Sequence, residues 1–166
     1  MVSSKPSVFL MDSMLTFSRD FINKTGAKEE TIPEIDSFPA DNIDTKSIAL
    51  LISNAFGFDR LNMVFTADYN TSNGKIKEFI SSRKNPEQAK DLARSYSEFL
   101  VSLGGKILKP DIELEDLSII EIMDEYEIIF TNGSFLTGIH SANDLKEAKK
   151  LAFVLNKKLK GNTHVR

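Results

Sequence analysis

The stretch LNMVFTADYNTSNGKIKEFISSRKNPEQAKDLARSYSEFLVSL, residues 61–103, contains two strand patterns, a tight turn and a helix in one continuous run. Apolar and polar side chains alternate from Leu61 to Tyr69, which is the period of a half-buried strand. Asn73-Gly74 follows, and this pair favours the positive φ angles of a tight hairpin turn. We therefore expect residues 75–83 to return antiparallel to the first strand.

A helix start follows this hairpin. Asn85 can cap the helix, Pro86 suits its first position, and Gln88 stands where a capping-box partner would stand. Apolar residues then recur at spacings of three and four: Ala89, Leu92, Ala93, Tyr96, Phe99, Leu100 and Leu103. The sequence predicts a helix over 86–103 that ends at Gly104-Gly105.

The chain after this helix predicts three more strands, at 117–123, 126–131 and 134–140. Asn132-Gly133 forms a second hairpin turn between the last two. The pattern Ser141-Ala142-Asn143-Asp144 resembles a capping box and predicts a helix over 142–160. Its inward side chains would be Leu145, Ala148, Leu151, Ala152, Leu155 and Leu159.

Together these elements predict an α+β fold in the order ββαβββα, with an antiparallel sheet of about five strands. Neither helix is stable alone in water at this length, so each must bury its apolar stripe against the sheet. The simplest arrangement places both helices on one face of the sheet.

The first 44 residues are expected to lie outside this domain, which would span 45–166. A short amphipathic helix is predicted over 12–25, followed by an extended connector over 27–46 that contains two prolines. Residues 45–54 fit one face of a short helix, although the run Ile48–Ile52 would also suit a buried extended stretch.

The composition limits the class of function. The chain has 166 residues, a formal net charge of −3, no cysteine and two histidines. The acidic balance argues against a dedicated nucleic-acid binder, and the lack of cysteine excludes disulfides and thiolate metal sites. No apolar run approaches the roughly 20 residues of a membrane helix. Asp12 interrupts the run Val8–Met11, so we predict no signal peptide, expect a soluble protein and leave its compartment open.

His140 is the one histidine at a position that suggests chemistry, since it ends a predicted strand just before a helix start. It could act as a proton shuttle near an anion site. It could equally be a surface side chain at a strand edge, which we prefer because a site needs several convergent groups. No serine lies in a Gly-x-Ser-x-Gly pattern, so we predict no catalytic, cofactor-binding or metal-binding residue and no cofactor.

Charge is distributed unevenly along the second half of the chain. Eight acids and no lysine or arginine lie between Asp111 and Glu127. They could bind a cation such as Ca²⁺, but the stretch lacks the glycine turn of a calcium loop, so a solvated acidic edge is preferred. The last helix carries a lysine face that could approach anionic lipid or nucleic acid, or could merely solvate its exposed side. Its members are Lys146, Lys149, Lys150, Lys157, Lys158 and Lys160.

Aromatic residues are spread over the same elements, and they could line an apolar pocket between sheet and helices. Their spacing is also what a core requires, so a core is the default expectation. They are Tyr69, Phe79, Tyr96, Phe99, Tyr126, Phe130 and Phe135.

Four segments resemble, in order, the C-terminal half of an uncharacterised bacterial family whose members are mostly predicted to be exported or lipid-anchored. They are Ala55-Phe56-Gly57-Phe58-Asp59, Val64–Tyr69, Asn85-Pro86-Glu87-Gln88-Ala89 and Asn132–Ile139. The resemblance covers residues 55–161 and implies no catalytic or ligand residue, because the family has no established function. The order of elements is also similar to the roadblock or profilin-like sandwich, whose members are dimerising adaptors.

We expect a non-enzymatic binding or assembly module whose partner is a second copy or another protein. A binder of a small apolar or anionic ligand, held between the sheet and the helix starts at Asn85 and Ser141, is the alternative. A hydrolase that uses His140 with the nearby carboxylates is the remote one.

Overall fold

The computed structural model describes residues 7–25 and 31–162, with side chains up to Gly161. The chain divides into two compact units, Met1–Thr31 and Ile32–Arg166. Helix α1 (Val8–Thr25) belongs to the first unit and has no buried residue. It begins one turn earlier than predicted, where the Ser7 hydroxyl accepts a hydrogen bond from the Leu10 amide at 3.2 Å.

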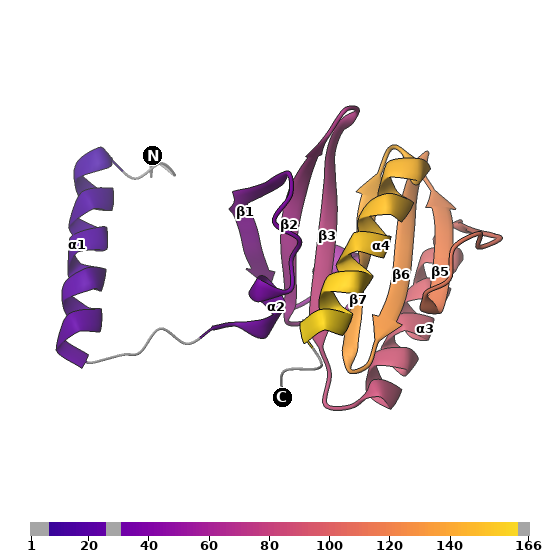
Figure 1. Cartoon of the computed structure of the whole chain (residues 1–166), viewed down its shortest axis with the longest axis horizontal. Helices are drawn as coiled ribbons and strands as arrows, with labels where there is room; N and C mark the ends of the chain where they lie inside the picture. Colours follow the sequence, from indigo (N-terminus) through magenta and orange to yellow (C-terminus); the bar gives the residue numbers. More distant parts are fainter. Residues whose placement is uncertain (1–6, 26–30, 163–166) are drawn as a thin grey trace. The chain divides into compact units, whose positions relative to one another are not determined.

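The second unit is built on a seven-stranded antiparallel sheet in the order β1-β2-β3-β7-β6-β5-β4 (Figure 1). The strands are β1 (Ile43–Leu51), β2 (Val64–Thr71), β3 (Gly74–Ser82), β4 (Lys106–Leu108), β5 (Glu115–Ile122), β6 (Glu125–Asn132) and β7 (Phe135–Ala142). The antiparallel α+β prediction is confirmed, whereas the count of about five strands is wrong by the two edge strands, β1 and β4.

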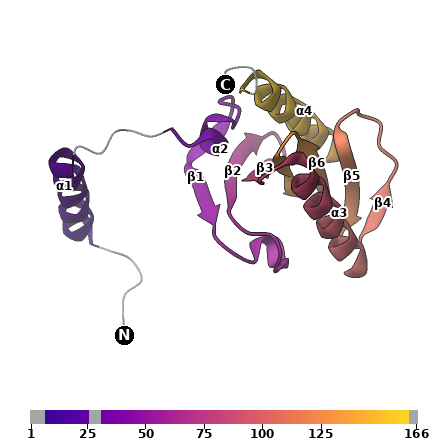
Figure 2. The same cartoon turned by 90° about the horizontal axis from the view of Figure 1, so that it is seen from below.

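The two long helices of the second unit, α3 and α4, cover opposite faces of this sheet, and Figure 2 shows the strands between them. On one face α3 (Pro86–Ser102) packs Leu92 and Tyr96 against Phe79 of β3. On the other face α4 (Leu145–Asn162) packs Ala152 and Leu155 into a separate cluster. The predicted placement of both helices on one face is therefore wrong.

The reason lies in the central strands, which have no polar side. Ile128 and Ile129 are both fully buried, although neighbouring residues of a strand point to opposite faces. The same holds for Ile119 and Ile120 of β5. Continuous apolar runs of this kind indicate strands that are covered on both faces.

The predicted helix over 45–54 is also wrong, because β1 occupies most of it and pairs with β2. The register shifts between Asp44 and Ala49, so β1 is bulged. The alternative of an extended run at Ile48–Ile52 is thus close to what forms. The predicted connector over 27–46 contains the single-turn helix α2 (Pro33–Asp36) and the start of β1, and its residues 27–30 lie outside the described part.

Predictions of helix caps from local sequence were more accurate than the predicted helix over 45–54. Asn85 accepts a hydrogen bond from the Gln88 amide at 2.9 Å and caps α3 as predicted. The cap of α4 is Asp144, which accepts from the Lys146 amide at 2.9 Å and the Glu147 amide at 3.1 Å. Ser141, predicted to cap this helix, lies in β7 instead.

Helix α3 lies mainly against β5, β6 and β7. On the same face, the sheet continues beyond the helix to β4 in one direction and to β3, β2 and β1 in the other. The short 3-10 turn η1 (Ala55–Gly57) contributes Phe56, which packs against the α3 cluster.

Candidate functional site

The register of the sheet brings charged residues on the α3 face into one transverse row. Asp44 pairs with Asp68, Asp68 with Lys77, and Lys77 with His140. His140 in turn approaches Glu127 of β6, with 2.7 Å between Nδ1 and Oε1. The row therefore crosses five strands, from the β1 edge to the centre of the sheet.

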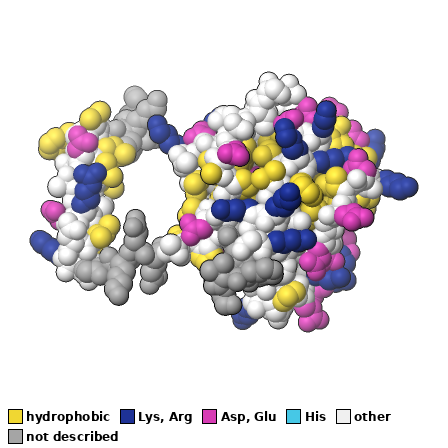
Figure 3. All heavy atoms as spheres, in the orientation of Figure 1, with side chains coloured by type: hydrophobic (Ala, Val, Ile, Leu, Met, Phe, Trp, Pro, Cys, Tyr) yellow, Lys and Arg dark blue, Asp and Glu magenta, His cyan; other side chains and the backbone are white. Residues whose placement is uncertain are grey.

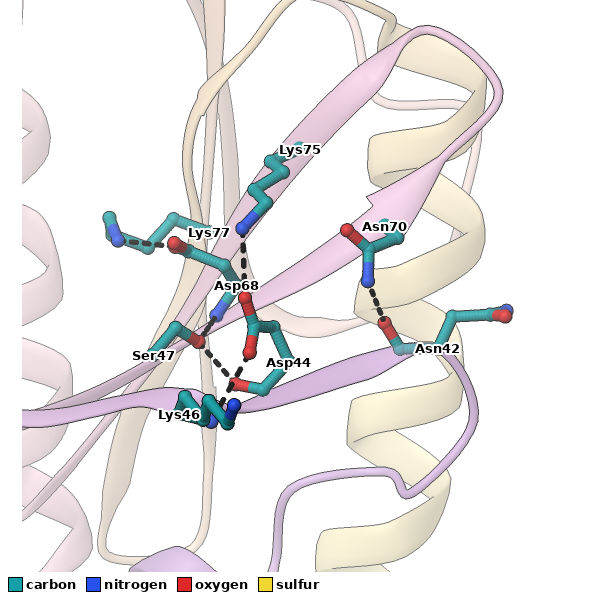
Figure 4. Close-up of polar contacts among 8 residues, drawn as sticks. All are labelled: Asn42, Asp44, Lys46, Ser47, Asp68, Asn70, Lys75 and Lys77. Carbon is teal, nitrogen blue, oxygen red and sulfur yellow. Dashed lines mark hydrogen bonds and ion pairs between the residues drawn. The ribbon is translucent and has the colours of Figure 1, made fainter.

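The edge half of the row consists of matched charges (Figure 4). Lys75 Nζ lies 2.8 Å from Asp44 Oδ2, and Lys77 pairs with Asp68. The hydrogen bond from Lys75 is the main reason that the pKa of Asp44 lies below its usual value. The Ser47 hydroxyl donates to Asp44 O at 2.6 Å and accepts from the Asp68 amide at 2.7 Å. These contacts hold the bulge of β1, and charges and bulges at an edge strand oppose pairing with other chains.

The central half of the row ends on a buried carboxylate. Glu127 is only 2% exposed. Its Oε1 accepts a hydrogen bond from the Ser141 amide at 2.9 Å, and its Oε2 lies 3.5 Å from the Tyr96 hydroxyl. Burial, and secondly the charge of Glu127, raise the pKa of Tyr96, so this phenol stays protonated.

A bulge in β7 creates this arrangement. Tyr126 pairs with Ala142 and Ile128 with Ile139, so β7 has one residue more than β6 between the two pairs. Ser141 has φ of 54°, in the left-handed region, as expected for a bulge. Glu127 accepts the hydrogen bond of the Ser141 amide and so supports the bulge.

Ser141, His140 and Glu127 follow the order of a nucleophile, a base and the group that orients the base. The distance from Ser141 Oγ to His140 Nε2 is 3.4 Å. However, Nδ1 of His140 has no hydrogen bond of acceptable direction despite its short distance to Glu127. The Ser141 amide, a natural donor to an oxyanion, is already bonded to Glu127.

Phe56 covers the His140 ring, with ring centroids 3.8 Å apart and planes 23° apart. Phe56 itself has φ of 54°, which is unfavourable for a bulky residue. The prediction of His140 as a surface side chain at a strand edge is wrong, because the residue is half-buried on the central strand β7. Its ring packs beside the β7 bulge, under Phe56.

A groove opens on the opposite side of α3, where the sheet extends past the helix to β4. It encloses a volume of about 470 Å³. It is lined by Lys90, Arg94, Ser97, Glu98, Val101, Ile107, Asp116 and Ser118. The α3 members recur at helical spacing and therefore form one wall. We call this hollow the α3–β4 groove.

The groove is polarised along its length. At the end nearer the start of α3, Lys90 Nζ lies 2.8 Å from Asp116 Oδ1, and this bond from Lys90 is the main cause that lowers the pKa of Asp116. At the other end lie Val101 and Ile107, which are 39% and 67% exposed. Ile107 pairs with Ile120, a member of the α3 cluster, and so faces the helix side of the sheet.

The predicted acidic stretch does not converge on one point. Asp111 pairs with Lys149 at 2.6 Å, Asp116 with Lys90, and Glu127 is buried beside His140. Within residues 7–25 and 31–161, no group of three or more His, Asp or Glu side chains is arranged to hold a metal ion.

Most of the seven aromatic residues singled out in the sequence are core residues, which was the default expectation. Tyr69, Phe79, Tyr96 and Phe130 are fully buried. They divide between the clusters on the two faces of the sheet, and the α3–β4 groove contains no aromatic side chain.

Sequence reasoning missed Glu78, which is fully buried in β3. Neither of its carboxyl oxygens has a hydrogen-bond partner among the described residues. Burial raises the pKa of Glu78 to about 8, against a smaller opposing effect of the Tyr69 hydroxyl. The sequence did contain a sign that Glu78 is buried, because the residue stands between Ile76 and Ile80 on the apolar side of the strand.

Comparison with known proteins gives no matching family model, no similar curated protein and no similar solved structure. Among the described helices, none combines the length and the hydropathy that crossing a membrane requires.

Proposed function

We propose that residues 32–166 form a non-enzymatic binding module that holds a small ligand in the α3–β4 groove. The observation that supports this proposal is the hollow of about 470 Å³ beside α3. Its volume falls in the usual range of small-molecule sites, which are mostly apolar and carry a few polar groups that orient the ligand.

The polarity of the groove selects the ligand class. An apolar body would cover Val101 and Ile107, while an anionic group would meet Arg94, since Lys90 is paired with Asp116. Arg94 is available because its bond to Asp91, at 2.8 Å, joins two exposed side chains three residues apart. Such surface pairs are worth little and exchange partners readily. The ligand is therefore an amphiphile with a carboxylate or similar end.

The chemistry beside His140 supports a binding module rather than a hydrolase. The imidazole lies under Phe56, and the amide of Ser141 is bonded to Glu127. A hydrolase would need an exposed nucleophile with free donors around it.

Thermal shift and calorimetry with decanoate as the probe test the groove. Decanoate should raise the melting temperature of the whole chain more than decanol does, because decanol lacks the charge. Val101→Asp should abolish the shift. The matched control is Val154→Asp on α4, whose residue is 40% exposed against 39% for Val101, and it should leave the shift unchanged. Equal shifts in both variants, or none with the wild-type chain, would contradict the proposal.

Self-assembly through α1 is the second candidate. One side of this helix carries large exposed apolar residues: Leu10, Met11, Met14, Leu15, Phe17, Phe21 and Ile22. An 18-residue helix with no buried side chain is marginal in water and gains stability by packing. The two acids and two bases on its other side cancel, so α1 helices of separate copies do not repel one another.

Light scattering of the whole chain over a wide concentration range measures this assembly. The chain should associate, and Phe17→Glu with Phe21→Glu should return it to a monomer. Thr16→Glu is the control, since Thr16 lies in one row with Asp12 and Asp20 on the polar side of α1. A wild-type chain that remains monomeric over the whole concentration range would contradict self-assembly through α1.

A further inference from the structure

The side of α4 that faces away from the sheet combines lysines with exposed apolar side chains. Ala148, Ala152, Leu155 and Leu159 turn inward and are fully buried. The opposite side presents Lys146, Lys150, Phe153, Val154, Lys157 and Lys158, all exposed. We call these six residues the α4 outer face. In Figure 3, Lys and Arg side chains gather over α4 with hydrophobic side chains between them.

The two apolar members lie within the lysine row. Phe153 is 48% exposed and Val154 is 40% exposed. Lys157 Nζ lies 5.1 Å from the centroid of the Phe153 ring. A long lysine stem can lie along such an apolar surface and keep its ammonium group in water.

The positive charge of this face is largely uncompensated. Lys150 makes one loose ion pair with Glu147, at 3.9 Å, and the neighbouring Lys149 is paired with Asp111. Lys146, Lys157 and Lys158 form no ion pair within the described part of the chain. The net charge of −3 does not cancel this local field, because charges further away than about 10 Å are screened at moderate salt.

We propose that the α4 outer face docks the protein on an anionic lipid surface, with Phe153 and Val154 at the headgroup boundary. Basic residues around a few protruding apolar side chains are typical of surface-lying helices. Nucleic acid fits less well, because α4 contains no arginine to make forked contacts with phosphate, and Phe153 is the one residue of the α4 outer face that can stack on a base. Each lysine near such a surface contributes about a fivefold gain in partitioning.

Cosedimentation with vesicles tests this proposal on the whole chain. The protein should pellet with vesicles of equal parts phosphatidylcholine and phosphatidylglycerol, remain in solution with phosphatidylcholine alone, and be released by high salt. Lys150→Glu with Lys157→Glu should reduce partitioning about 25-fold or more, from the loss of two lysines. Phe153→Ser should weaken binding without altering its dependence on salt.

The matched control is Lys84→Glu with Lys106→Glu, which changes the net charge equally at two exposed lysines outside α4, one before α3 and one in β4. Binding that falls equally in both double variants would overturn the proposal, since it would then reflect net charge alone. So would equal binding to neutral vesicles, because the lysines of the α4 outer face would then contribute nothing. Tight binding of single-stranded RNA with no binding of anionic vesicles would also overturn it. Val101→Asp should leave vesicle binding intact, so that this surface and the α3–β4 groove are tested separately.

Discussion

Glu78 places a carboxyl group inside the core between β3 and α4. Its neighbours along the strand, Ile76 and Ile80, belong to the same apolar cluster as the inner side of α4. A carboxylate there would lack the hydrogen bonds and partner charges that make buried charges tolerable. The side chain therefore remains protonated at neutral pH, since burial raises its pKa to about 8.

This raised pKa predicts a pH-dependent stability. Between the pKa values of the unfolded and folded states, about 4.5 and about 8, the folded chain holds a proton that the unfolded chain has released. The contribution of Glu78 to stability is thus complete when the pH is below the pKa of the unfolded chain. It is lost as the pH rises through the pKa of the folded chain. The free energy of unfolding should fall by up to about 1.4 kcal/mol per pH unit in this window.

Urea unfolding of the wild-type chain and of Glu78→Gln between pH 5 and pH 9 measures the effect. The variant should lose this slope, whereas Glu98→Gln, at an exposed position, should keep it. Parallel curves for the wild-type chain and Glu78→Gln would show that this carboxyl group is already ionised in the folded state.

At the scale of single residues the sequence allowed partial prediction. Asn85 was recognisable as a cap because its role depends only on the next three residues. The pairing of His140 with Glu127 was not recognisable, since it depends on a bulge that shifts the register between β6 and β7. Ser141 was assigned to the wrong element for the same reason.

At the scale of elements, β7 holds the centre of the sheet between β3 and β6. Its Gly138 pairs with Phe79 on one side and with Ile129 on the other. A Cβ atom at this position would lie 1.9 Å from Ile128 O and 2.9 Å from the Phe79 ring. The backbone oxygen cannot move without disturbing the strand pairing.

Gly138→Ala should therefore cost about 3 kcal/mol of stability, at the upper end of the usual cost of overpacking. Gly161→Ala is the control, because nothing lies within 4 Å of a Cβ atom at that position. Denaturant unfolding compares the two. A Gly138→Ala chain as stable as the control would mean that a Cβ atom at residue 138 does not meet Ile128 O.

The strands and helices that sequence patterns located are those with strong local signals. The hairpins at Asn73-Gly74 and Asn132-Gly133 and the helix after Asn85 all form. Sequence patterns did not predict the edge strands, because β4 has only three residues and the bulge in β1 breaks the alternation of apolar and polar residues. Their pairing is decided by the neighbouring strands rather than by their own sequence.

At the scale of the whole second unit, one helix on each face of a seven-stranded sheet explains where binding surfaces arise. Helix α3 is too narrow to cover its face, so a groove remains between it and β4. Helix α4 fills its own side with small and branched residues and turns its lysines outward. The groove was not predictable from the sequence, since it depends on β4 extending the sheet beyond α3.

Chemical-shift mapping tests the central claim most directly, namely that the α3–β4 groove is the ligand site of this module. Titration of the isotopically labelled whole chain with decanoate should move the amide signals of residues 90–101, 107 and 116–118, while those of β1 to β3 remain in place. Shifts centred instead on Phe56 and His140 would contradict the account, as would an unchanged spectrum at millimolar decanoate.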